Sequence, residues 1–263
     1  MLGKVPANRL RLIEGIVRAA RRHTPASERA LTDAFLRAYF RGVGDDDLVA
    51  RGADELAGAA LAHLAGGRIR RAGCPTVRVF NPDASKDGFR SAHTIVMIVC
   101  EDMPFLVDSM VMAANQTNLG VHLIVHPIID VLRDGRGRMQ QLVPAGTAGS
   151  RAESWQYLEV DRQTDPARLA ELEARLLSAL DDVRVAVDDW GAMRQRAHDV
   201  SNLLQKVPQP LAKSEVAEVA EARALLDWMI DNHFTLLGAR YYRLDRGRAG
   251  DRLVPDGDRK SVV

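Results

Sequence analysis

The sequence has few cysteines and no secretion signal. Only Cys74 and Cys100 occur in 263 residues, which is too few for a disulfide framework or a cysteine-based metal site. We expect two reduced thiols that are buried or half-buried. Residues 1–6 contain no apolar signal-peptide core, so secretion is not expected.

Long apolar runs and an excess of one charge sign are also absent. The longest apolar runs are far below the roughly 20 residues that span a bilayer, so no membrane partner is expected. The 36 basic and 35 acidic residues give a formal net charge of +1, which offers no electrostatic reason to expect nucleic acid. A hydrophobic content of 46% and a charged content of 27% are ordinary for a soluble protein. We therefore expect a cytoplasmic location.

The chain has no complete phosphate-binding loop and no recognisable catalytic constellation. Gly135 and Gly137 follow an apolar run, but Gln140 occupies the third glycine position of the dinucleotide fingerprint. Asp134 before this pair favours a hairpin turn instead. Ser109 lacks the context of a nucleophile elbow. We expect no catalytic residue and no cofactor site in this chain.

Two histidines have a spacing that occurs in metal sites. In a strand, His122 and His126 would share a face about 13 Å apart at roughly 3.3 Å per residue, which is too far for one ion. In a helix, the zinc pattern needs a glutamate at position 123, where the residue is Leu123. We expect structural or interface histidines and no metal. One of them could instead tune a ligand site by its charge.

A strand followed by a helix is predicted in the middle of the chain. Residues 93–100 form a β-branched apolar run that is typical of a buried strand. Pro104 suits the first turn of a helix. Asp102 or Met103 is expected to cap that helix, with Asp the better cap. Gly120 is expected to end it in the left-handed conformation.

The unit continues with two more strands and a helix. Residues 121–131 resume a strand-like run, and Asp134 and Gly135 mark a hairpin turn. Residues 155–160 are the predicted return strand, and Asp165 with Pro166 opens a further helix. The pattern is β-α-β-β-α.

Helices are predicted on both sides of this unit. Residues 1–65 carry helical stripes, with a Ser27 cap before the second helix and a third helix from residue 45. A long helical pattern follows Pro166, and we expect a break at residues 188–191 because one helix of that length would be unusual. Residues 183–187 also alternate, so a fourth strand is the alternative there.

The C-terminal part is predicted to start a new unit. Residues 208–210 form a linker, a helix follows, and residues 233–244 suggest a strand with no later partner. Isolated strands leave backbone groups unpaired, so we expect that the natural product was longer or that its end is altered.

The three tryptophans are expected to be core anchors: Trp155, Trp190 and Trp228.

Three segments in order resemble the N-terminal region of the large bacterial NAD-specific glutamate dehydrogenases. The resemblance spans roughly residues 10 to 245 and is specific because the segments occur together. The segments are 103–109 with 120–127, 182–190 with Met193 and Arg194, and 231–238 with Tyr241. The end of the chain, residues 258–263, departs from the family pattern.

The resemblance implies an α+β fold with an ACT-like, ferredoxin-like unit. That unit would cover about residues 74–190, with a mainly antiparallel sheet, N-terminal helices before it and a long helical segment after it. We expect a helical segment at 1–73, an ACT-like domain with following helices at 74–206, and a linker with an incomplete second ACT-like domain at 207–263.

The resemblance also implies a parent enzyme that converts L-glutamate to 2-oxoglutarate and ammonia while reducing NAD. Its catalytic domain would lie far downstream, so this chain is expected to be inactive alone and NAD to belong to the parent. The expected partners are the rest of that enzyme or other subunits of a homo-oligomer. The alternative is a free-standing amino-acid sensor or interaction module.

ACT-type units usually hold an effector amino acid near the first strand-to-helix turn and at a subunit interface. Backbone N–H groups at a helix start favour an anionic carboxylate, although Asp102 would oppose it unless it bound the amino group. The alternative is a purely structural turn in a domain that serves assembly. The candidate effector or interface residues are Asp102, Met103, Pro104, Asp108, His122 and His126.

Overall fold

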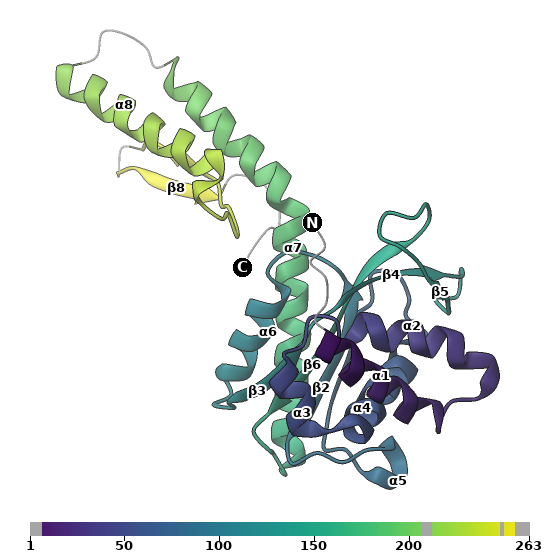
Figure 1. Ribbon diagram of the computed structural model, residues 1–263. Helices are drawn as coiled ribbons and strands as arrows, with labels where there is room; N and C mark the ends of the chain where they lie inside the picture. Colours follow the sequence, from purple (N-terminus) through teal and green to yellow (C-terminus); the bar gives the residue numbers. More distant parts are fainter. Residues whose placement is uncertain (1–6, 207–211, 248–249, 256–263) are drawn as a thin grey trace. The chain divides into compact units, whose positions relative to one another are not determined.

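The computed structural model describes residues 7–206, 212–247 and 250–255. The chain forms two compact units, one up to Leu180 and one from Asp181 onward. Helix α7 (Pro166–Leu204) crosses that division, so its two parts are treated with their own units. Figure 1 labels the elements along the chain.

The first unit is built on an antiparallel sheet with the order β1-β2-β6-β4-β5, in which β3 pairs with β6 beside β4. This arrangement confirms the α+β class and the antiparallel sheet. The strands are β1 (Thr76–Phe80), β2 (Thr94–Glu101), β3 (Val121–Val125), β4 (Ile128–Arg133), β5 (Met139–Leu142) and β6 (Arg151–Val160). The predicted strands at 93–100 and 155–160 are therefore confirmed. The run at 121–131 splits at Pro127 into β3 and β4.

Four helices of the described N-terminal residues cover one face of this sheet (Figure 1). Their apolar stripes pack on strand residues that point to that face, and Trp155 lies fully buried among them. A Cβ at Gly67 would lie 2.2 Å from the Trp155 ring, so only glycine allows this close packing. The helices are α1 (Ala7–Arg21), α2 (Arg29–Tyr39), α3 (Asp45–Arg51) and α4 (Ala53–Gly67).

Helix α6 (Leu106–Asn115) and the first part of α7 cover the other face (Figure 1). Every residue of β2 from Thr94 to Cys100 is buried, as expected for a central strand between two helical layers. The short helix α5 (Ala84–Asp87) lies between β1 and β2 in sequence.

The predicted ends of α6 are wrong at both termini. The Asp102 N–H donates to the Ala152 carbonyl at 3.0 Å and so prolongs the sheet. The helix begins four residues later, with Phe105 at the cap position in the left-handed conformation (φ 69°) and no side-chain cap. After the helix, Asn118 rather than Gly120 takes the left-handed conformation (φ 58°).

The predicted break in α7 is also wrong, since one helix runs from Pro166 to Leu204. Residues 183–187 are helical, which confirms the preferred interpretation over a fourth strand. Asp165 accepts a hydrogen bond from the Ala167 N–H at 2.9 Å and confirms the predicted start. Ser27 is not a cap, because it lies in the short 3-10 helix η1 (Ala26–Glu28) that precedes α2.

The second unit contains the rest of α7, helix α8 (Lys213–Trp228), the π-helical turn η2 (Met229–His233) and a hairpin of β7 (Tyr242–Asp245) and β8 (Arg252–Pro255). The strand predicted at 233–244 is therefore mostly wrong, and so is the expectation that it lacks a partner. The predicted linker at 208–210 and the tail at 258–263 lie outside the described residues.

Three side-chain predictions need correction. Trp155 is buried as predicted, but Trp190 and Trp228 are 39% and 49% exposed. Cys100 is buried, whereas Cys74 is exposed. Within the described residues, no helix is both long and apolar enough to cross a membrane.

Candidate functional site

The turn between β2 and α6 brings two of the predicted site residues together. Asp102 follows β2, and His126 lies at the corner between β3 and β4. Burial raises the pKa of the Asp102 carboxyl, while the nearby His126 lowers it. Burial lowers the pKa of the His126 imidazole, and Asp102 raises it. Because each group changes the pKa of the other, the Asp102 carboxyl and the His126 imidazole lie close enough to interact electrostatically.

A buried polar cluster continues from His126 into the sheet. The His126 Nε2 lies 2.8 Å from Ser154 Oγ, and Gln156 Nε2 donates to the same oxygen at 3.1 Å. Gln156 is fully buried, and its Oε1 has no hydrogen-bond partner among the described residues. Burial raises the pKa of the neighbouring Cys100 thiol to about 12, so this thiol is neutral at physiological pH.

The order Asp102, His126 and Ser154 has the composition of a nucleophilic triad. Ser154, however, is fully buried, so its oxygen is closed to a substrate, and Gln156 already donates to it. Nucleophile, base and orienting acid must converge on an accessible point. This cluster instead anchors the β3–β4 corner to β6.

His126 also reaches a cavity that the sequence did not indicate. The cavity has a volume of about 370 Å³ and lies between the end of α2 and the β3–β4 corner. Its lining includes Tyr39, Arg41, His126, Pro127 and Ile128. The side chains come from segments more than 80 residues apart, so local sequence patterns give no signal for it.

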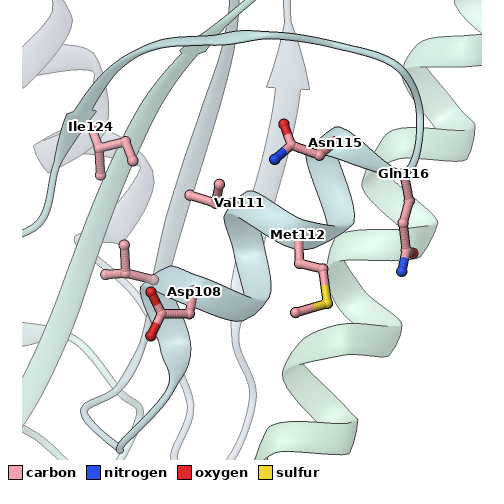
Figure 2. Close-up of a pocket in the computed structure, with 7 residues that line it drawn as sticks. Asp108, Val111, Met112, Asn115, Gln116 and Ile124 are labelled. Carbon is pink, nitrogen blue, oxygen red and sulfur yellow. The ribbon is translucent and has the colours of Figure 1, made fainter.

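Asp108 lies in a different place, on an open groove along the outer face of α6 (Figure 2). The groove has a volume of about 590 Å³, and Val111, Met112 and Ile124 contribute much of its apolar lining. Met112 is 59% exposed and Ile124 37% exposed. Among the described strands β3 pairs with β6 alone, so its outer edge is open beside this groove.

His122 is separated from the other candidates by the length of β3. Its Nε2 lies 2.7 Å from Asp161 Oδ1, and its ring stacks on His93 with centroids 4.4 Å apart. Asp161 also accepts from the Gly120 N–H at 2.7 Å. Asp161 therefore ties Gly120 and His122, at the start of β3, to the end of β6. No group of three possible metal ligands gathers among the residues that the structure describes.

Met103 and Pro104 lie in the turn itself. The hydrogen bonds described above involve neither side chain. Pro104 is exposed and precedes the cap residue Phe105, whose side chain is 48% exposed. The predicted candidates therefore divide into three places. The turn holds Asp102, Met103 and Pro104 near His126, the α6 groove holds Asp108, and the far end of β3 holds His122.

The glycine pair at 135 and 137 does not fit a dinucleotide. Gly137 closes the β4–β5 hairpin with a φ of 78°, and its carbonyl accepts from the Arg70 N–H at 2.9 Å. A Cβ at Gly137 would lie 2.3 Å from the Arg70 carbonyl oxygen. The space beside this loop is thus filled by the chain's own backbone, and no phosphate could take it.

Comparison with known proteins assigns this architecture. Residues 35–176 match the family described as "Glutamate dehydrogenase, ACT1 domain". The chain belongs to this family. The matched range contains α4, the sheet from β1 to β6, and α6, and it ends within α7. The resemblance inferred from residues 103–109 and 120–127 is thereby confirmed.

Two relatives carry the name NAD-specific glutamate dehydrogenase. The protein of Pseudomonas aeruginosa is 34% identical over 224 residues, which are 84% of this chain and 14% of the relative. That of Halomonas elongata is 36% identical over 244 residues, which are 91% of this chain and 15% of the relative. The chain thus spans about one seventh of the length of these relatives.

Proposed function

We propose that this chain is a non-catalytic regulatory and assembly portion of an NAD-specific glutamate dehydrogenase. The observation that carries the proposal is the match of residues 35–176 to the ACT1 domain, together with relatives of that name that are much longer. The parent reaction would be oxidation of L-glutamate with NAD and water to 2-oxoglutarate, ammonia and NADH. NAD and the catalytic residues would belong to the parts of the parent enzyme outside this chain. The parent enzyme would be cytoplasmic.

The regulatory part of the proposal concerns the β2–α6 turn. An effector amino acid would bind near Asp102, Met103 and Pro104, with its ammonium group on Asp102. His126, near Asp102, also lines the cavity of about 370 Å³, which is large enough for an amino acid but is not lined by the three turn residues. The half-buried His126 would respond to the charge of that ligand.

Isothermal titration of the chain with the protein amino acids tests this role. Binding that weakens in both Asp102→Asn and His126→Gln is expected. Arg136→Gln, an exposed substitution on the β4–β5 loop, is the control that should keep full affinity. Absence of heat with every amino acid would remove the effector proposal and leave assembly.

The assembly part concerns the groove on α6 and the open edge of β3. An unpaired edge strand beside exposed apolar side chains is a ready surface for another chain. We propose that a second copy packs there and makes the parent a homo-oligomer. The supporting residues are Met112 and Ile124, with Asp108 at the rim.

Light scattering during size-exclusion chromatography tests the assembly surface. Met112→Glu should convert an oligomer to monomer, because it places a charge on the apolar groove. Val49→Glu, which alters a similarly exposed apolar residue on α3 away from the groove, is the matched control. A monomeric wild-type chain at high concentration would contradict this interface.

A free-standing amino-acid sensor or interaction module is the second candidate. It is favoured by the compact, well-buried first unit, which needs no catalytic domain to form its core. The reading frame beyond codon 263 discriminates the two candidates. Continuation into a long homologous sequence supports the dehydrogenase portion, whereas a stop codon supports the module.

A further inference from the structure

A second cavity lies at the other end of the sheet from the effector turn. It is open to solvent, has a volume of about 430 Å³, and is bordered by three segments of the first unit. Helices α3 and α4 form one wall, the loop before β2 forms the opposite wall, and β6 supplies the floor. The charged lining residues are Arg51, Glu55, Arg90, His93 and Glu159.

The floor of this cavity is built and rigid. Glu159 is 2% exposed and accepts from Arg51 at 2.7 and 2.9 Å and from the Tyr157 hydroxyl at 3.2 Å. Arg51 also donates to Asp47 at 3.1 Å. A bidentate pair of this kind fixes the position of both charged groups.

The opposite wall is held in place by packing. Phe89, 4% exposed, anchors the loop against α4 at Gly58, where a Cβ would lie 2.6 Å from the Phe89 Cβ. Arg162 donates to the Ser91 carbonyl at 3.1 Å and pins the loop a second time. Arg90 and His93 are thereby presented to the cavity from a fixed segment.

Two opposite charges around the cavity lack partners. Within the described residues, neither Glu55 nor Arg90 takes part in a hydrogen bond or a salt bridge, although Arg51 lies close enough to act on Glu55 electrostatically. Burial raises the pKa of the Glu55 carboxyl, and Glu159 raises it further, while Arg51 lowers it. Burial and the nearby Glu159 therefore disfavour the charged form of Glu55, and a cation beside its carboxylate would stabilise that form.

We propose that this cavity binds a small zwitterionic metabolite, with its ammonium group on Glu55 and its carboxylate on Arg90 and His93. An ammonium donates up to three hydrogen bonds, which suits a carboxylate with no other partner. A guanidinium presents a planar fork that matches a carboxylate. A ligand with only one charge would leave the opposite wall unpaired.

Isothermal titration of the 263-residue chain with the protein amino acids at roughly 10 mM tests the proposal. The tightest ligand is then compared with its analogue lacking the ammonium group and its analogue lacking the carboxylate. Each analogue should bind roughly tenfold or more weakly, because one wall loses its partner. An analogue that binds as tightly as the parent ligand, or the absence of any binding, would overturn the zwitterion site.

Substitutions locate the ligand. Glu55→Gln and Arg90→Gln should each weaken binding by roughly tenfold or more, with the fold checked by circular dichroism. Glu171→Gln and Arg136→Gln change exposed charges elsewhere and should leave affinity unchanged. Asp102→Asn, which should weaken binding at the separate effector turn, should leave the affinity of this cavity for its ligand unchanged. Loss of binding in Asp102→Asn, with full binding in Glu55→Gln, would assign the ligand to the effector turn and overturn this proposal.

Discussion

The two compact units differ in how much apolar surface they bury. The first unit encloses a continuous core between the sheet and its helices, with Phe35, Tyr39 and Trp155 nearly or fully inaccessible. The described part of the second unit buries few apolar residues deeply, Met193 and Ile230 among them. Its exposed large apolar residues include Leu203, Val216, Leu225, Trp228, Phe234, Leu237, Tyr242, Leu244 and Leu253.

The contrast separates a part that can fold by its own core from a part that needs further contacts. A two-stranded hairpin such as β7–β8 is marginal without a covering layer. Exposed apolar surface of this kind marks contact with other protein. The first unit therefore has cavities supported by its own core, and the second unit offers exposed apolar surface for contact with further protein in addition to the α6 groove of the first.

The largest expected effect is the difference between two tryptophans. Trp155→Ala should destabilise the first unit by about 3–5 kcal/mol, because it empties a fully buried site. Trp228→Ala should cost less than about 1 kcal/mol, since its ring is 49% exposed. Urea unfolding followed by circular dichroism measures both, and Trp155→Phe serves if the alanine variant does not fold. Equal costs would contradict the contrast.

A buried ion network gives the next effect. Glu153, fully buried, accepts from Arg70 at 2.7 Å and from Arg133 at 2.7 and 2.8 Å. Glu153→Gln leaves two guanidinium groups without their anion and should cost about 3 kcal/mol. The exposed Glu171→Gln, which loses only an i,i+4 pair with Arg175, should cost less than about 0.5 kcal/mol. Similar unfolding midpoints for the two variants would contradict this account.

A buried histidine makes the first unit sensitive to acid. Tyr39 donates to His63 Nδ1 at 2.8 Å, and Nε2 lies 3.2 Å from the Ile98 carbonyl oxygen. Burial lowers the pKa of His63 from 6.5 to about 3. Below pH 6.5 the His63 imidazole therefore binds a proton in the unfolded chain but not in the folded chain. Stability should fall by about 1.4 kcal/mol per pH unit until the folded pKa is reached.

His63→Gln should remove most of this slope from the pH dependence of urea unfolding; His126, whose pKa burial also lowers, retains the remainder. His122→Gln should keep the whole slope, because His122 is exposed. A parent slope that survives unchanged in His63→Gln would contradict the assignment.

The smallest effect tests the continuity of α7. Gly191 lies inside the helix, and a Cβ there would meet no atom within 4 Å. Gly191→Ala should therefore stabilise the chain by about 0.5–1 kcal/mol through helix propensity. A loss of stability would indicate the break that the sequence suggested. Thermal unfolding with Gly66→Ala as a second helical site provides the comparison.

Local patterns predicted the elements better than their ends. The β-branched run of β2, the hairpin at Asp134 and the Asp165 cap were predictable because neighbouring residues decide them. Phe105 and Asn118 took the left-handed positions because sheet pairing of Asp102 and the Gly120–Asp161 hydrogen bond fix the chain on either side of α6. Such long-range contacts leave no local signal.

The candidate site was only partly predictable for the same reason. The family resemblance indicated the β2–α6 turn, and the structure places Asp102 near His126. The family resemblance could not indicate that Asp108 faces a separate groove or that His122 pairs with Asp161. The cavity with Glu55 and Arg90 combines segments that meet only when α4 packs on the loop before β2.

Glutamate-dependent NADH formation by the purified chain tests the central claim most directly. The account predicts no turnover at any chain concentration with glutamate and NAD in excess, because it proposes that this chain is a non-catalytic portion, and the matches cover only 14% and 15% of the relatives' length. NADH formation that rises in proportion to the chain and persists through further purification would contradict it.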